Sequence, residues 1–132
     1  MSDPRAREAA LDAYLAHYAA GRYFDAHEVL EGVWHRSGEA PMRLLHGLIQ
    51  WAVALEHHRR GNAHGARALL DRAMVNLADA PPGYMDLDLS RCRAAAPGLR
   101  NAFAAWERGG PRPGIVAPEL CRRGGGDVPD VG

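Results

Sequence analysis

The stretch PMRLLHGLIQWAVALEHHRRG, residues 41–61, decides the fold class because its apolar side chains recur at the spacing of an α-helix. Pro41 is typical of the first turn of a helix, and Gly61 is typical of the position just after the last turn. The apolar positions between them are Leu44, Leu45, Leu48, Trp51, Ala52 and Leu55. Because these side chains gather on one side, the pattern predicts an amphipathic helix with one face in a core.

Two helices are predicted before this stretch. Ser2-Asp3-Pro4 supplies a capping side chain followed by proline, and Gly21 ends the first helix. A second helix follows almost at once and ends near Ser37-Gly38. The apolar positions of the two helices are Leu11, Tyr14, Leu15, Tyr18, Tyr23, Ala26, Val29, Leu30 and Val33.

Two helical regions are predicted after it. Asn62 is a good capping residue for a fourth helix, and the composition of residues 79–84 indicates a loop. A fifth helical region spans residues 86–108, where Pro97-Gly98 is expected to kink or split it. No window alternates well enough to predict a strand. The expected fold class is all-α: a compact bundle of about five helices, built from two antiparallel helical hairpins plus a kinked C-terminal helix.

The composition changes at Gly109. Residues 109–132 contain seven glycines and four prolines among 24 positions and few large apolar side chains. Such a segment buries too little surface to offset its ordering entropy, although Ile115-Val116 could dock on the bundle. We therefore expect one helical-bundle domain at residues 1–108 and a flexible Gly/Pro-rich tail at residues 109–132.

Charge and hydropathy restrict the class of partner. The chain has 16 basic and 16 acidic residues without a basic cluster, which argues against nucleic-acid binding. The longest apolar run, Trp51–Leu55, is too short for a membrane span, and the N-terminus lacks the apolar region of a secretory signal. Cys92 and Cys121 do not form a Cys-x-x-Cys motif and favour a reducing compartment. The sequence thus predicts a cytoplasmic protein.

Three motifs together resemble a known family. They are Ala26-His27-Glu28 with Glu31 and Trp34, then GLIQWAVALEH at residues 47–57, and finally GNAHGA at residues 61–66. In this combination the chain resembles a bacterial domain-of-unknown-function family, number 309 in its series. The resemblance implies a compact helical bundle and implies no reaction.

Polar side chains form a stripe on two of the predicted helices. At about 100° per residue, His46, Gln50 and His57 share one side of the third helix. On the second helix His27, Glu31 and Trp34 share a stripe, flanked by Glu28 and His35. The candidate polar cluster comprises His27, Glu28, Glu31, Trp34, Gln50 and His57.

These stripes have three interpretations. They are solvated faces, or a partly buried network in which Glu31 accepts from His27 or His57 and Gln50 bridges, or a metal site. The candidate metal ligands are His27, Glu31 and His57, but their spacing matches neither zincins nor ferritin-like proteins. A bound divalent metal is therefore not favoured, and no other cofactor is indicated.

The sequence leaves two hypotheses for function. It lacks a Gly-rich phosphate loop, a nucleophile elbow and a thiol motif, so the first is a non-enzymatic binding or interaction module for a protein or small-molecule partner. The alternative is a metal- or acid/base-dependent enzyme that uses the His/Glu/Gln cluster between the second and third helices. A homo-oligomer is compatible with both.

Overall fold

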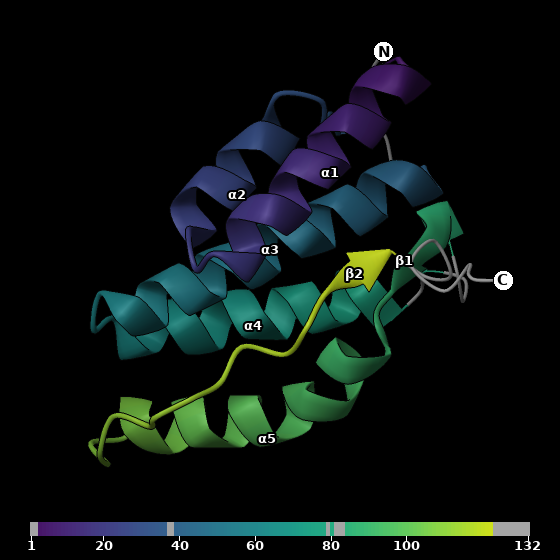
Figure 1. Ribbon diagram of the computed structural model, residues 1–132. Coiled ribbons are helices and arrows are strands. Elements are labelled where there is room, and N and C mark those ends of the chain that lie inside the picture. The colour runs from purple at the N-terminus through teal and green to yellow at the C-terminus, as the bar shows by residue number, and fades with distance from the viewer. Residues whose placement is uncertain (1–2, 37–38, 79, 81–83, 123–132) are drawn as a thin grey trace, which may run out of the picture.

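The computed structural model describes residues 3–36, 39–78, 80 and 84–122. The helices in these ranges form a compact all-α bundle, as the sequence predicted (Figure 1). They are α1 (Pro4–Ala19), α2 (Tyr23–Glu31), α3 (Ala40–Arg59), α4 (Ala63–Ala78) and α5 (Ser90–Glu107), with a short 3-10 helix at Tyr84–Asp86. Two antiparallel strands, β1 (Leu87–Asp88) and β2 (Cys121–Arg122), complete these elements.

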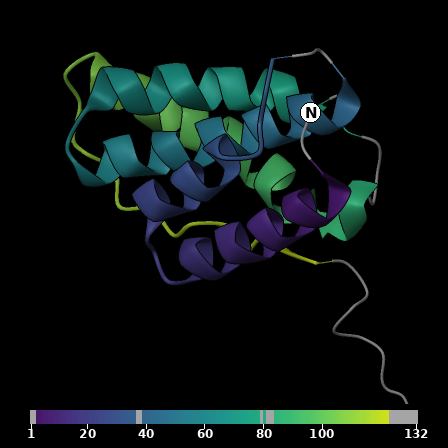
Figure 2. The same cartoon turned by 90° about the horizontal axis from the view of Figure 1, so that it is seen from above.

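The helices are arranged as two hairpins and a fifth helix. α1 packs on α2, α3 packs most extensively on α4, and α5 covers α4. Gly21 and Gly61 turn the chain within the two hairpins with φ of +77° and +82°, a conformation that glycine adopts without strain. α3 lies between α4 and the first hairpin (Figure 2). It is therefore the central helix, which explains why its sequence is the most regularly apolar.

The core forms around α3. Leu48 and Trp51 of α3 are buried together with Leu11, Leu30 and Phe103 from three other helices. Burying each of these large side chains contributes about 1.5–3 kcal/mol. Polar groups of the buried aromatic side chains form hydrogen bonds within this core. The Trp51 indole N–H, for example, donates to the Tyr18 hydroxyl at 3.1 Å.

α5 differs in detail from its prediction. It starts at Ser90 because residues 87–88 pair with β2, and Asp88 Oδ1 accepts from the Ser90 backbone N–H at 2.9 Å. The helix runs through Pro97, whose side chain is exposed, and is not split there. The strands were not expected, because a two-residue strand is too short to show an alternating pattern.

Residues 109–122, which we name the C-terminal segment, make contacts with the bundle that their composition did not indicate. The segment runs back from the end of α5 across the bundle to β2 (Figure 1). Leu120 is only 5% exposed, and the Pro118 carbonyl accepts from the Tyr18 hydroxyl at 2.6 Å. Val116, in contrast, is 90% exposed. The remainder of the predicted tail, residues 123–132, lies outside the described residues.

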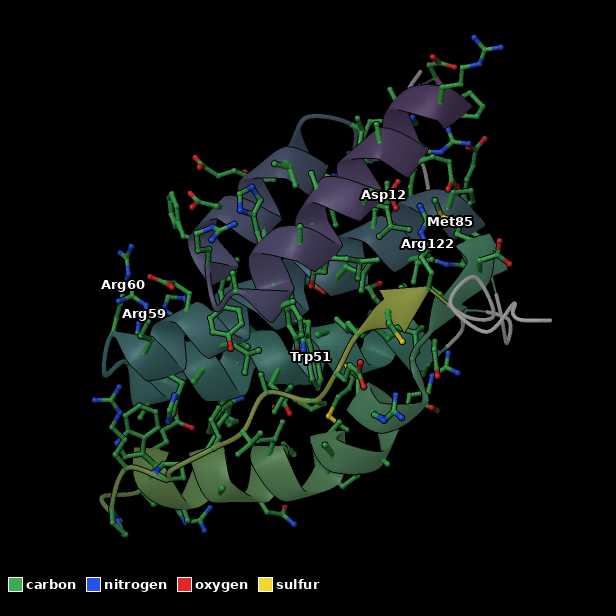
Figure 3. All side chains as sticks on the ribbon, viewed as in Figure 1. Asp12, Trp51, Arg59, Arg60, Met85 and Arg122 are labelled. Atoms are coloured by element: carbon green, nitrogen blue, oxygen red, sulfur yellow. The ribbon has the colours of Figure 1, made fainter. Side chains whose placement is uncertain are left out.

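Arg122 fixes the end of the C-terminal segment. Its guanidinium pairs with Glu8 at 2.8 Å and with Asp12 at 2.9 Å, and it donates to the Met85 carbonyl at 2.9 Å. Figure 3 shows Arg122 between Asp12 and Met85. Composition alone does not indicate such contacts, because they depend on a backbone carbonyl and on the charge of one arginine and not on apolar side chains.

None of the helices in the described part of the chain combines the length and the apolar character that a bilayer crossing requires.

Candidate functional site

The motif residues gather on one side of the bundle, along α2, α3 and α4. On α3 the residues His46, Gln50, Val53 and His57 fall on one side of the helix, and all four are at least partly buried. α2 and α4 flank α3 on its two sides, so this stripe lies between them. We name this side the polar face. Its polar and aromatic members are His27, Glu31, Trp34, His46, Gln50, His57, Asn62 and Asn76.

Two glycines bring α3 and α4 together at this face. A Cβ at Gly47 would lie 2.7 Å from Leu77 Cδ2, and one at Gly65 would lie 2.7 Å from His57 Cγ. Real side chains do not approach so closely, which means that each position needs a glycine for the two helices to pack at this distance. The glycines of the second and third sequence motifs therefore have a structural role.

A chain of hydrogen bonds crosses from α4 to α3. The Asn76 side-chain amide donates to Gln50 Oε1 at 2.7 Å, and Gln50 Nε2 lies 3.2 Å from His46 Nε2. Gln50 is only 7% exposed, so this polar group is buried and satisfied on both of its ends. The His46 ring also packs on Trp34, with 4.6 Å between the centroids and 31° between the planes. This arrangement fits the network interpretation for Gln50, with Asn76 and His46 as partners in place of Glu31.

The two α3 imidazoles of the polar face favour their neutral form. Burial lowers the pKa of His46, and the nearby Arg36 lowers it further. Burial and Arg60 likewise lower the pKa of His57, and Glu56 partly opposes them. Because an unperturbed histidine has a pKa of about 6.5, both rings are uncharged at neutral pH.

His57 is also part of the turn that starts α4. Its Nδ1 lies 3.2 Å from the Asn62 side-chain amide, whose Oδ1 accepts from the Gly65 backbone N–H at 2.9 Å. Asn62 therefore caps α4, as the sequence predicted, and at the same time orients the His57 ring.

The carboxylates of α2 are solvated. Glu31 is 54% exposed at its side chain, and its Oε1 lies 3.6 Å from His27 Nε2, while the His27 side chain is 13% exposed. His27 Nδ1 also bonds the Phe24 carbonyl within the same helix. Glu28 is exposed. For Glu28 and Glu31 the geometry thus fits the solvated-face interpretation.

An exposed aromatic ring lies at the end of the polar face. Phe24 is 45% exposed, with the His27 ring 4.7 Å from it at 64° and the Arg60 guanidinium carbon 5.4 Å from its centroid. Arg60 and Arg59, which Figure 3 shows at this end of the molecule, both bond the buried Glu56. These bonds, opposed by burial, lower the pKa of the Glu56 carboxyl.

The candidate cluster of the sequence is thus divided into three groups. His27 pairs with Glu31, Trp34 and Gln50 both contact His46, and His57 contacts Asn62. In residues 3–36, 39–78, 80 and 84–122, no three His, Cys, Asp or Glu side chains come close enough to hold a metal ion. His27, Glu31 and His57 therefore do not form such a group in this structure.

Sequence reasoning missed three residues of this region. Asn76 was not singled out, since a lone amide on a helix gives no signal by itself. Glu56 precedes Arg59 and Arg60 at the spacing of ion pairs on a helix, and this signal could have been used. Phe24 lies on the solvent side of α2, where an aromatic is unusual and could have been flagged.

Comparison with known proteins adds a family and two relatives. Residues 11–69 match the sequence model of a family described as a domain of unknown function, DUF309. An uncharacterized protein of Aquifex aeolicus (strain VF5) is 32% identical over 99 residues, which are 73% of this chain and 29% of that protein. The uncharacterized protein YpuF of Bacillus subtilis (strain 168) is 39% identical over 82 residues, 61% of this chain and 47% of that protein. The chain spans less than half the length of both relatives.

Proposed function

Residues 11–69 of this chain belong to the DUF309 family, a domain of unknown function, and from this premise we propose that the chain is a non-enzymatic interaction module. It binds a partner protein through α2 and the adjoining polar face. The observation that carries the proposal is Phe24, a large apolar ring that is 45% exposed on a motif-bearing helix. Interfaces are enriched in aromatic residues and arginine, and a few such residues supply most of the binding energy.

The surroundings of Phe24 support a role as an anchor. The His27 ring and the Arg60 guanidinium both lie against Phe24, and these contacts limit the motion of its ring before binding. A side chain that is already ordered loses less entropy when a partner covers it. At the opposite end of the polar face, Trp34 is partly exposed and packs on His46. The polar face therefore has an aromatic side chain at each end.

The charges around Phe24 favour a basic partner. Asp25, Glu28 and Glu31 are exposed on α2, whereas Arg59 and Arg60 both pair with Glu56. Asp25 and Glu28 therefore remain available for pairing with a partner, and Glu31 faces solvent beside His27. We expect a protein segment that places an apolar side chain on Phe24 and Lys or Arg side chains opposite the α2 carboxylates.

Three further observations support a non-enzymatic interaction module in the cytoplasm. Matches to this chain recur inside longer relatives, which is typical of a domain that is combined with other segments. The enzymatic alternative has less support because His27 and Glu31 on α2 do not converge with His57 on α3. Cys92 and Cys121 are free thiols, which is consistent with placing the module in the cytoplasm.

A capture experiment tests the proposal. A photoreactive amino acid replaces the exposed Arg22, which directly precedes α2, in the full chain, and cross-linked proteins are identified with and without Phe24→Asp in the same chain. The matched control is Val116→Asp, which changes an apolar side chain that is 90% exposed on the C-terminal segment. We expect Phe24→Asp to abolish the cross-link and Val116→Asp to leave it unchanged, because only Phe24 belongs to the proposed contact.

Affinity for the captured protein provides the second measurement. Truncating an interface anchor typically costs about 2 kcal/mol or more, so Phe24→Asp should weaken binding by about 30-fold or more. A Glu28→Arg variant should also weaken binding, and more strongly at low salt than at high salt. Equal affinities for wild type, Phe24→Asp and Val116→Asp would contradict the proposal.

A further inference from the structure

A cavity lies between α4 and α5, with α3 at its base. Its volume is about 350 Å³, and Met74 and Leu77 of α4, Cys92 and Ala96 of α5, and Trp51 of α3 line it. Small-molecule sites in proteins typically measure about 300–1,000 Å³ and are mostly apolar with a few polar groups. The cavity has both properties. It involves none of the residues of the polar face, so it is a separate feature of the fold.

Apart from Arg93, the described side chains that line the cavity carry no charge. The indole N–H of Trp51 is bonded to the Tyr18 hydroxyl, which leaves the apolar ring to line the cavity. Burial raises the pKa of the Cys92 thiol to about 12, so this side chain stays protonated and behaves as a small apolar group. An apolar ligand would therefore replace water against these walls with favourable free energy.

One cation lines the cavity, the guanidinium of Arg93. Its Nη2 donates to the carbonyls of Leu77 at 2.7 Å and Ala80 at 2.9 Å, at the end of α4. These bonds fix the position of the group. The remaining N–H groups of Arg93 form no hydrogen bond with another described residue, and the side chain is exposed. An oriented guanidinium with unused donors favours a carboxylate or another oxyanion.

We propose that this cavity binds a small amphipathic anion whose apolar body lies against Trp51 and Cys92 and whose carboxylate pairs with Arg93. A cavity of about 150 Å³ holds benzene, so this one has room for a molecule roughly twice that size. A medium-chain carboxylate such as decanoate has a suitable volume and a charge at one end. Binding does not depend on the interaction surface around Phe24.

Calorimetric titration of the full chain with decanoate tests the proposal, with decanol and decyltrimethylammonium as probes of equal chain length. We expect decanoate to bind most tightly and the cation least, because Arg93 attracts the carboxylate and repels the ammonium group. Arg93→Gln should weaken decanoate about tenfold, which is about 1.4 kcal/mol, and leave decanol within about twofold, because only decanoate forms a charge-assisted bond with the guanidinium. The matched control is Arg91→Gln, which removes an exposed arginine of the same helix that pairs with Glu119.

A variant that fills the cavity tests the proposal independently of charge. Ala78 lines the cavity and is exposed, so Ala78→Leu adds volume there without crowding the core. This variant should weaken decanoate and decanol together by about tenfold or more, since the added carbon atoms occupy the site. If the Arg93→Gln variant does not fold, the proposal is still tested by the Ala78→Leu variant and by the comparison of the three probes. Equal binding of the three probes, or decanoate binding that Ala78→Leu leaves unchanged, would overturn the proposal.

Discussion

Removing the C-terminal segment should destabilise the bundle. A chain that ends at Gly110 loses the Leu120 side chain, the Pro118 carbonyl that accepts from Tyr18, and all contacts of Arg122. A chain that ends at Arg122 keeps every one of these contacts. It is therefore the matched control, because it removes only residues 123–132.

The magnitude follows from the contacts that are lost. Leu120 is 5% exposed, and deleting a buried leucine side chain costs about 2–5 kcal/mol. The hydrogen bond from Tyr18 contributes about 1 kcal/mol, and the ion pairs of Arg122 contribute at most about 1 kcal/mol each because Glu8 and Asp12 are exposed. Removing the segment also removes the entropy cost of ordering it, which offsets part of this sum. We expect a net loss of about 2–4 kcal/mol.

Thermal and urea melts of the three chains measure this loss. For a domain of this size, about 1 kcal/mol shifts the melting temperature by roughly 3–5 °C, so the chain ending at Gly110 should melt about 6–20 °C below the control. Leu120→Ala in the full chain should reproduce a large part of the shift, because it removes the main apolar contact without shortening the chain. A chain ending at Gly110 that melts within about 2 °C of the one ending at Arg122 would refute the reasoning.

Three further predictions concern the helices. The pKa of His46 and His57 is lowered in the folded state, so the stability they contribute is complete above the unfolded value of about 6.5 and falls as the pH drops through it. Thermal melts at pH 7.5 and 5.5, conditions chosen about one unit on either side of that value, measure this effect. The fall in melting temperature from the higher to the lower pH should be smaller when His46 and His57 are both replaced by Gln. Gly47→Ala should cost about 1–3 kcal/mol in urea unfolding, whereas Gly98→Ala, with no atom within 4 Å of its Cβ, should stabilise by about 0.5–1 kcal/mol. Trp51→Ala, at a residue 1% exposed, should cost about 3–5 kcal/mol in the same assay.

The helices were predictable because each repeats an apolar pattern over several turns. Residues 41–61 contain every signal that defines α3, from the proline at its start to the glycine after its end. The C-terminal segment was not predictable in this way. Its contacts join residues far apart in the chain, such as Arg122 with Asp12, and no local pattern encodes such a pair.

The polar stripes were predictable, but their burial was not. Helix spacing places Gln50 with His46 and His57, and it places Glu31 with His27. In the structure Gln50 is 7% exposed, whereas the Glu31 side chain is 54% exposed. The difference in exposure arises because α4 packs against the side of α3 that carries Gln50. The sequence of a single helix does not indicate which of its sides a neighbouring helix covers.

The sequence motifs combine residues with two kinds of role. Gly65 and Asn62 are explained by the fold, since the first allows α4 to approach His57 and the second caps α4. Glu28 and Glu31 are exposed and contribute little to packing, so the fold does not explain their place in the motif. Exposed charges of this kind typically change stability by no more than about 0.5 kcal/mol when they are replaced. If Glu28→Gln and Glu31→Gln leave the melting temperature unchanged and weaken partner binding, their role lies in recognition, which is what the proposal for α2 requires.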